Sequence, residues 1–347
     1  MEFTYLKEQE PVETVVEDES TRHDIIAKNG DTITDRILAE NQGQAVKEEN
    51  QAAREDAPGT SAGEETGEEE GEEDNSEMPA WTTAVEVSPV KDLSMEQLGD
   101  FNYLLNNFFI VDEDTATSAE QLNAAEFLAN DLTVKKDPRT PQILIYHSHT
   151  QETFADSREG VVEDSIVGVG NYLAKILTET YGYQVLHVTE EFDLAGGVLD
   201  RNKAYDYARP YIEQILKENP SIEVVIDLHR DGVAEDRRLV TEINGKPTAQ
   251  IMFFNGLSYT VSGGPVDYLP NPYIQDNLAF SFQMEYQAAQ YYPDFYRGIY
   301  LSGLRYNLHL CRRAVLLEAG AQTNTVQEVK NAMEPFADIL NRVLTGE

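Results

Sequence analysis

Two histidines and a glutamate follow a short apolar segment near the middle of the chain. Residues 143–146 read Ile-Leu-Ile-Tyr, a composition typical of a buried strand, and His147, His149 and Glu152 come directly after it. In open α/β sheets, ligands bind beyond the carboxyl ends of the strands. His149 and Glu152 stand three residues apart, and an imidazole and a carboxylate are both ligands that Zn²⁺ accepts. This segment therefore predicts one part of a metal site.

Two later apolar segments end in the same way and could complete the site. Residues 224–228 precede His229, which would add a third ligand and leave one position open for water, as in catalytic zinc sites. Asp231 or another carboxylate would orient an imidazole through its second nitrogen. Residues 314–317 precede Glu318, a carboxylate that is costly to bury without a task or a partner. Beside a water activated by zinc, Glu318 would serve as the general base and then as the acid.

His147 and Arg230, which lie next to these motif residues in the sequence, each have more than one possible role. The alternation of strand side chains puts His147 and His149 on the same face, so both are expected to enter the site, one as a ligand and the other as a secondary or substrate contact. Arg230 would bind a substrate carboxylate, or it would pair with Asp227 or Asp231.

Simpler roles are expected for several other polar residues. Glu163 and Asp164 precede a predicted helix, where the helix dipole favours acidic side chains. We expect His187 and His309 to be hydrogen-bonded in place. The single cysteine, Cys311, excludes an internal disulfide and is expected to be a buried, unreactive thiol.

The elements that must position these residues alternate along the chain between strand and helix patterns. This order predicts an α/β fold with a mostly parallel central sheet flanked by helices. Asn244-Gly245 adds one expected hairpin, between residues 239–243 and 248–254. The predicted strands are 142–146, 184–188, 224–228, 251–254, 298–301 and 314–317, and the predicted helices are 165–180, 203–217, 276–291 and 326–344.

Composition divides the chain into three parts. Residues 1–80 contribute roughly half of the formal net charge of −37 and contain little apolar sequence, so a disordered acidic arm or linker is expected. Residues 81–138 form a predicted helical extension, with capping boxes at Ser94 and Ser118 ahead of two helices. Residues 139–347 form the predicted catalytic domain, which begins after the proline-rich segment 137–141.

Charge and hydropathy exclude several classes of function. A chain this acidic repels phosphate groups, so nucleic-acid binding is not expected. No run of about twenty apolar residues predicts a membrane span. The first residues lack the basic and apolar regions of a signal peptide.

Three motifs together resemble the stage II sporulation protein P family, the peptidoglycan amidases of the engulfment machinery in endospore-forming bacteria. They are residues 147–152 (HSHTQE), 226–231 (IDLHRD) and 313–320 (RAVLLEAG). The likeness extends to residues 102–109, 169–170 and 306–307, and it covers roughly residues 100–345.

The resemblance implies a relationship to zinc N-acetylmuramoyl-L-alanine amidases, which cleave the amide between N-acetylmuramic acid and the L-alanine of the stem peptide. By this likeness, His149 and His229 would bind Zn²⁺ and Glu318 would be catalytic, with His147 and Arg230 as secondary contacts. The family's own motif favours Glu152 as the carboxylate ligand, whereas the broader amidases favour a position near the next helix, which here is Glu163. We take Glu152 as the expected ligand.

The resemblance also implies a location and partners. Family members act outside the cytoplasm, tethered by an N-terminal membrane segment, on peptidoglycan. Their companions are a sporulation lytic transglycosylase of the SpoIID type and membrane-anchored engulfment proteins. No tether is visible in this chain, so we expect either that the sequence begins after it or that its start is misassigned.

Two other functions fit the same residues. A zinc carboxypeptidase would use the same HxxE, distant histidine and glutamate, with Arg230 holding a terminal carboxylate. A non-catalytic scaffold would use the acidic arm and the tyrosine-rich segment 286–306 as binding surfaces.

Overall fold

The computed structural model describes residues 91–194 and 197–347. The predicted acidic arm, residues 1–80, and the first residues of the predicted extension lie outside this part of the chain. Among the described residues, no helix combines the length and the apolar character needed to cross a membrane.

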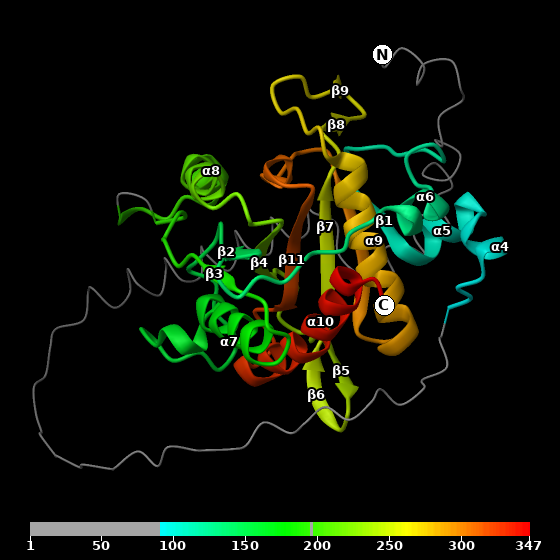
Figure 1. Cartoon of the computed structure of the whole chain (residues 1–347). Helices are drawn as coiled ribbons and strands as arrows, with labels where there is room; N and C mark the ends of the chain where they lie inside the picture. The colour runs from blue at the N-terminus through cyan, green and yellow to red at the C-terminus, as the bar shows by residue number, and fades with distance from the viewer. Residues whose placement is uncertain (1–90, 195–196) are drawn as a thin grey trace, which may run out of the picture.

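A seven-stranded sheet forms the centre of the molecule, in the order β1-β10-β7-β11-β4-β2-β3 (Figure 1). Neighbouring strands are parallel except β7 and β11, which are antiparallel. The predicted α/β fold with a mostly parallel sheet is confirmed. The strands are β1 (Phe109–Val111), β2 (Ile143–Tyr146), β3 (Val185–His187), β4 (Val224–Asp231), β7 (Ile251–Gly256), β10 (Tyr296–Ser302) and β11 (Arg313–Ala321).

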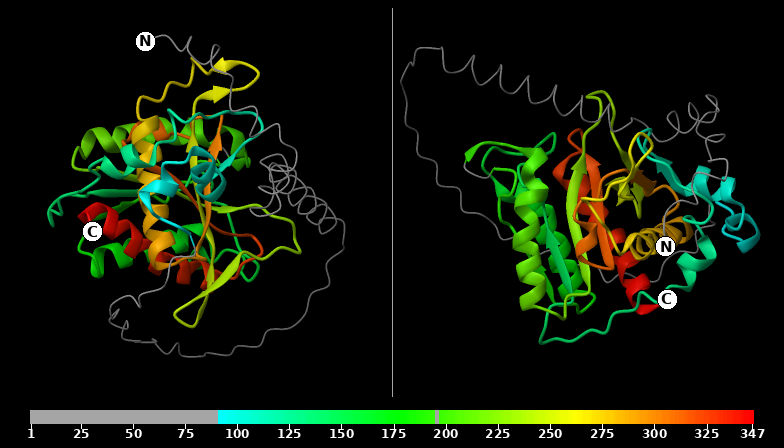
Figure 2. Two further views of the ribbon diagram at one scale, coloured as in Figure 1. Left: turned by 90° about the vertical axis from the view of Figure 1, so that its right-hand side faces the viewer. Right: turned by 90° about the horizontal axis from the view of Figure 1, so that it is seen from above.

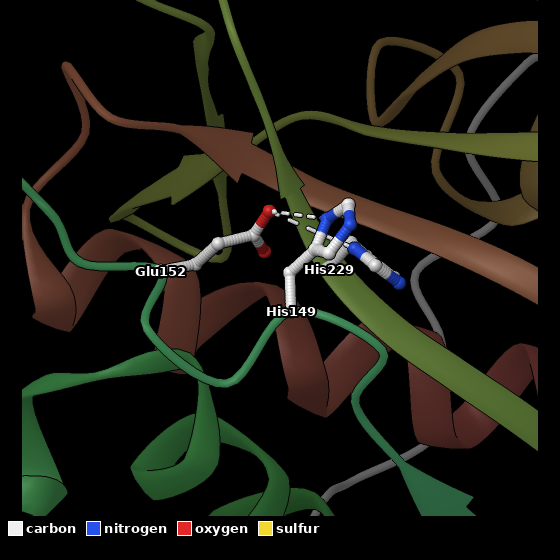
Figure 3. A group of neighbouring side chains, drawn as sticks. All are labelled: His149, Glu152 and His229. Carbon is white, nitrogen blue, oxygen red and sulfur yellow. Dashed lines mark ion pairs between the residues drawn. The ribbon is translucent and has the colours of Figure 1, made fainter. Parts of the chain in front are cut away.

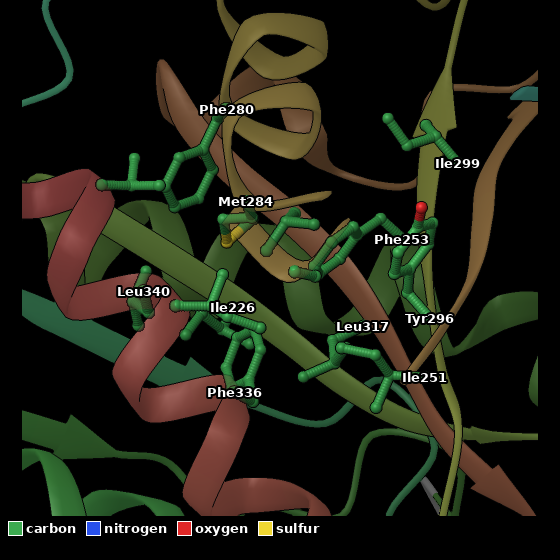
Figure 4. Packing of buried hydrophobic residues seen from close by; sticks show 14 of the residues in the cluster. Ile226, Ile251, Phe253, Phe280, Met284, Tyr296, Ile299, Leu317, Phe336 and Leu340 are labelled. Carbon is green, nitrogen blue, oxygen red and sulfur yellow. The ribbon is translucent and has the colours of Figure 1, made fainter. Parts of the chain in front are cut away.

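The two faces of the sheet are covered unequally. Side chains that alternate along the strands fall into two clusters, because successive residues of a strand point to opposite faces. The larger cluster packs on α7 (Ile166–Glu179), α9 (Ile274–Tyr291) and α10 (Val326–Thr345), and Figure 4 shows Phe336 and Leu340 of α10 beside strand residues. The smaller cluster packs on α8 (Arg201–Glu218), which lies on the other side of β2 and β4 from α7 (Figure 1).

All four helices predicted after residue 139 are present, with ends within two residues of those expected. Ser165 caps α7 by accepting a hydrogen bond from the Val167 amide. Thr325 and Glu328 form a capping box at the start of α10.

The segment before residue 139 differs from its prediction. The expected single helix after Ser94 is broken into α4 (Met95–Leu98) and α5 (Phe101–Phe108), because Asp100 caps a new helix start by accepting from the Tyr103 amide. The second helix, α6 (Ala124–Ala129), begins later than Ser118 predicted, since Asn123 is its cap. Strand β1 was not predicted. It directly follows α5 and forms the outermost strand of the central sheet, where it pairs with β10.

The predicted hairpin is present but shorter than expected. Strands β5 (Val240–Ile243) and β6 (Lys246–Ala249) pair around Asn244 and Gly245, which both have positive φ, and the hairpin projects from the sheet (Figure 2). The chain leaves this pair after Ala249 and continues as β7 in the central sheet. A small hairpin, β8 (Tyr259–Thr260) with β9 (Gly264–Pro265), and two 3₁₀ turns, η2 (Val162–Asp164) and η4 (Leu308–Leu310), complete these elements.

Cys311 is half-buried. Its thiol donates to the carbonyl of Glu223, and burial raises the pKa of the thiol. A raised pKa lowers the thiolate fraction, which favours the unreactive thiol that the sequence predicts.

One carboxylate is buried in the main core. Glu285 of α9 is fully buried, and neither of its oxygens has a hydrogen-bond partner. Its nearest cation is Lys91, with Nζ 4.0 Å from Glu285 Oε1, above the rings of Phe108 and Tyr296. Burial raises the pKa of Glu285 well above its usual value, and the attraction of Lys91 only partly opposes this.

This burial makes stability depend on pH. Because the pKa of Glu285 is higher in the folded state, its protonation stabilises the fold fully below the unfolded pKa of 4.5, and that contribution is lost as the pH rises toward the folded pKa. We predict that the free energy of unfolding of the parent falls relative to Glu285→Gln as the pH rises above 4.5. Denaturant unfolding of both proteins at a series of pH values measures the difference. A difference independent of pH would contradict the prediction.

Candidate metal centre

Three parallel strands end at one edge of the sheet and carry the polar residues of the candidate site. Strands β2, β4 and β11 point the same way, so their carboxyl ends lie together. On β4, Asp227 and His229 alternate with core residues and point to the α8 face. Glu318 of β11 is the register partner of His229, so it lies beside His229 on that face.

His149, Glu152 and His229 come together at this edge (Figure 3). Glu152 Oε1 lies 3.4 Å from His149 Nδ1 and 3.6 Å from His229 Nδ1, and the three candidate ligand atoms all lie within 4.8 Å of one another. Ligands bound about 2.0–2.1 Å from a tetrahedral zinc are roughly 3.4 Å apart. The spacing of these atoms therefore suits a single ion.

Glu152 has one oxygen engaged and one directed at the imidazoles. Its Oε2 accepts from the Arg230 amide at 2.9 Å, whereas its buried Oε1 has no hydrogen-bond partner. A buried carboxylate oxygen in this state is costly unless a cation completes its surroundings. The unpartnered oxygen is thus the feature of the site that best fits a metal ion.

The charges of the site also favour a cation beside Glu152 Oε1. Burial would raise the pKa of Glu152, but the charge of His229 and the polar contacts with both imidazoles hold it well below its usual value. Burial would lower the pKa of His229, but Asp227 and Glu152 outweigh it and raise that pKa well above 6.5. The two carboxylates therefore create a field that binds positive charge, whether a proton or a metal ion.

Both histidines are held with the same nitrogen facing the site. His229 Nε2 lies 2.8 Å from Asp227 Oδ1, and His149 Nε2 lies 3.2 Å from the carbonyl oxygen of Arg201. Because both partners accept, each Nε2 carries the proton and each Nδ1 keeps its lone pair for a metal. The carboxylate that orients His229 is Asp227, and not Asp231, the residue named in the prediction, which pairs with Arg297.

Asp227 also joins two strand ends. Its carboxylate accepts from the amide of Ser148 at 2.8 Å and from the hydroxyl of Ser148 at 2.5 Å. These bonds fix the turn after β2, which carries His149 and Glu152, against β4, which carries His229.

Arg230 and Glu163 lie apart from the three-residue group. The Arg230 guanidinium donates to the carbonyls of Thr153 and Asp231, and so holds the backbone beside Glu152. Glu163 is exposed in η2, before α7. The structure places Glu152, and not Glu163, with the two imidazoles.

His147 lies on the opposite face of the sheet from this group. Strand β2 ends at Tyr146, so the alternation does not extend to His149, and His147 points toward α7. Its Nδ1 donates to the Leu228 carbonyl at 2.7 Å, and its Nε2 lies 2.8 Å from Nε2 of His187. Burial lowers the pKa of His147 to about 3.

A glycine makes room for this histidine pair. A Cβ on Gly170 of α7 would lie 2.6 Å from His187 Nε2 and 2.7 Å from His147 Nε2, so only glycine fits there. His187 is hydrogen-bonded in place as predicted, through Asn171 and His147. His309 differs, since its buried Nδ1 has no hydrogen-bond partner.

Two residues of α8 belong to the site, and sequence analysis missed both. The ring of Tyr205 lies 5.6 Å from that of His149 and 6.4 Å from that of His229, between centroids. Burial raises the pKa of Tyr205, and the charges of Asp227 and Glu318 raise it further. Arg201 Nη1 lies 3.8 Å from Glu152 Oε1. No spacing within the sequence could connect either residue with motifs that lie more than twenty positions away.

Comparison with known proteins identifies the family. The sequence profile of stage II sporulation protein P (SpoIIP) matches residues 4–341. The chain belongs to this family. A stage II sporulation protein P of Bacillus subtilis (strain 168) is 23% identical over 215 residues, which are 58% of this chain and 50% of that relative. The match thus spans about half the length of that SpoIIP.

Solved amidase structures are also similar to this SpoIIP chain, at low identity. The amidase Ami1 of Mycobacterium smegmatis is 13% identical with a TM-score of 0.37, covering 60% of this chain and 96% of that one. The CwlD amidase of Clostridioides difficile, solved in complex with the GerS lipoprotein, is 11% identical with a TM-score of 0.36, covering 59% of this chain and 100% of that one.

The carboxylate ligand can be tested by metal binding. We predict that Glu152→Gln loses most of the zinc affinity, because it removes the buried charge between the imidazoles, whereas Glu163→Gln retains it. Competition with a chromophoric chelator measures both affinities. Loss of affinity in Glu163→Gln alone would reverse the assignment.

The role of Asp227 gives a second prediction. Asp227→Asn should weaken zinc binding about 10–100-fold, since the amide no longer fixes the His229 tautomer or supplies charge. The same chelator titration applies, with Asp164→Asn, at an Arg158-paired carboxylate near the surface, as the matched control. Equal affinities in the parent and both variants would show that Asp227 does not support a metal ligand.

Proposed function

We propose that this SpoIIP chain is a zinc-dependent peptidoglycan amidase, which cleaves the amide between N-acetylmuramic acid and the L-alanine of the stem peptide during sporulation. The observation that carries the proposal is the convergence of His149, Glu152 and His229, with Glu318 beside His229. Family membership supports peptidoglycan as the substrate class.

Zinc fits the donor set best. Two imidazoles and one carboxylate leave one coordination position open, as in catalytic zinc sites, and the unpartnered Glu152 Oε1 is directed to where an ion would be bound. Zinc bound there would polarise the scissile carbonyl and lower the pKa of a water molecule.

Glu318 supplies the proton transfers. As a carboxylate on the strand next to His229, it takes a proton from the attacking water while the water oxygen bonds to the carbonyl carbon. It then gives that proton to the amide nitrogen as the C–N bond breaks. The products are a free lactyl carboxylate on the glycan and a stem peptide with a free amino group.

Location and partners follow from the family as further parts of the proposal. The substrate lies in the cell wall, so the enzyme acts outside the cytoplasm, held near the membrane. A SpoIID-type lytic transglycosylase and membrane-anchored engulfment proteins are the expected companions.

Digestion of purified peptidoglycan tests the proposed reaction. The zinc-loaded chain should release intact stem peptides and leave lactyl-ended glycan, as mass spectrometry would show. A zinc carboxypeptidase would instead release a terminal amino acid. Glu318→Gln should lower the rate about 10²–10⁴-fold with zinc still bound, because it removes the proton acceptor.

The exposed Glu163→Gln serves as the control variant and should keep the parent rate. Unchanged turnover in Glu318→Gln would remove the catalytic role of this residue. Purification without stoichiometric zinc and with no release of peptides would favour the scaffold instead.

A further inference from the structure

The first turn of α8 is fixed to the segment that carries His149 and Glu152. The buried carboxylate of Asp193 accepts from the Thr150 hydroxyl at 2.6 Å and from the Gln151 amide at 3.1 Å. The carbonyl of Asp193 in turn accepts from the amide of Asp200 at 2.7 Å, and Asp200 caps α8. Arg201, the first residue of α8, therefore has a set position relative to the candidate ligands.

Arg201 contacts two of the three candidate ligands. Its carbonyl oxygen accepts from His149 Nε2, and its Nη1 lies 3.8 Å from Glu152 Oε1, the oxygen directed at the imidazoles. Its side chain is 16% exposed, whereas that of Glu152 is 1% exposed. The guanidinium therefore lies beside the candidate ligand Glu152 and is less deeply buried than its carboxylate.

Arg201 differs from Arg230 in what its guanidinium can reach. Arg230 donates to the carbonyls of Thr153 and Asp231 and supports the backbone. Arg201 approaches Glu152 at ion-pair distance, beyond the length of a hydrogen bond, and Glu152 already receives its hydrogen bond from the Arg230 amide. Holding Glu152 in place is therefore the task of Arg230.

The charges around the site indicate a role for Arg201 in stabilising negative charge. Asp227 and Glu152 are carboxylates, and both would repel the negative charge that forms on a carbonyl oxygen during amide hydrolysis. A guanidinium remains charged at any working pH and offers several donors in one plane. Donors placed where charge develops stabilise the transition state more than the bound substrate.

We infer that Arg201 is a further catalytic residue, which donates to the carbonyl oxygen of the scissile amide as that oxygen becomes negative. The inference rests on the proposed function and names the group that binds the oxyanion. When the water oxygen bonds to the carbonyl carbon, the π electron pair moves to the carbonyl oxygen and Arg201 stabilises it. The pair returns when the C–N bond breaks and the nitrogen takes the proton from Glu318.

The test compares Arg201→Gln and Arg201→Lys with the parent as zinc-loaded full chains. Arg158→Gln, which removes a guanidinium paired with Asp164 elsewhere, is the matched control. Four quantities are measured: kcat and KM on a soluble muramoyl-peptide, the affinity for zinc by chelator competition, and the affinity for dimethylphosphinate by ³¹P NMR titration. Dimethylphosphinate is a small tetrahedral anion whose binding does not require turnover.

Arg201→Gln should lower kcat about 10²–10³-fold with little change in KM, because the contact forms mainly in the transition state. Its phosphinate affinity should fall at least about tenfold, while its zinc affinity stays near that of the parent. Arg201→Lys keeps the charge but loses the planar arrangement of donors. Its kcat and its phosphinate affinity should lie between those of the parent and those of Arg201→Gln.

Other results overturn the inference or separate it from the proposed reaction. Weaker zinc binding with unchanged kcat at saturating zinc would show that Arg201 only positions Glu152. Unchanged kcat and phosphinate affinity in Arg201→Gln, with an active parent, would refute the oxyanion contact and leave the amidase proposal intact. An inactive parent whose phosphinate binding still depends on Arg201 would support an anion contact and refute the proposed reaction.

Discussion

The buried carboxylate of Asp227 is the contact on which the candidate site depends. It accepts from the imidazole of His229 on its own strand and from the amide and hydroxyl of Ser148 in the turn after β2. One side chain therefore sets the tautomer of a candidate ligand and the position of the segment that carries the other two. A buried carboxylate with this many donors remains charged, and its charge makes the surrounding pocket favourable for a cation.

The direction of the strands decides which residues can share the site. The antiparallel contact between β7 and β11 divides the sheet, so β11, β4, β2 and β3 end at one edge and β7, β10 and β1 at the other. The three motifs occupy strands of the first group. Arg297, at the start of β10, still reaches this edge and pairs with Asp231, because the reversed strands begin where the others end.

The sequence predicts the parts of this arrangement that depend on local pattern. Apolar, β-branched runs predict β2, β4 and β11, and the polar residues at their ends predict His149, Glu152 and His229 as a group. Local pattern fails where the chain departs from regular geometry. Strand β2 stops at Tyr146, so alternation wrongly assigns His147 and His149 to one face.

The other features of the site depend on tertiary packing, which local sequence pattern does not predict. Nothing in the apolar composition of residues 251–254 indicates that β7 runs antiparallel to β11. Tyr205 and Arg201 reach the site only because α8 packs across the strand ends, fixed there by Asp193. Arg230, adjacent to His229 in the sequence, is the more obvious candidate for substrate binding, yet its Nε and Nη1 donate to backbone carbonyls.

Because the two faces of the sheet are covered unequally, the residues that stabilise the fold are largely different from those that could carry out chemistry. Most of the apolar packing lies under α7, α9 and α10, whereas Asp227, His229 and Glu318 lie on the face covered by the single helix α8. Substitutions at the candidate ligands therefore remove little of the packing that holds the chain folded. Selection could alter specificity on one face of such a sheet while the other face continues to supply most of the stability.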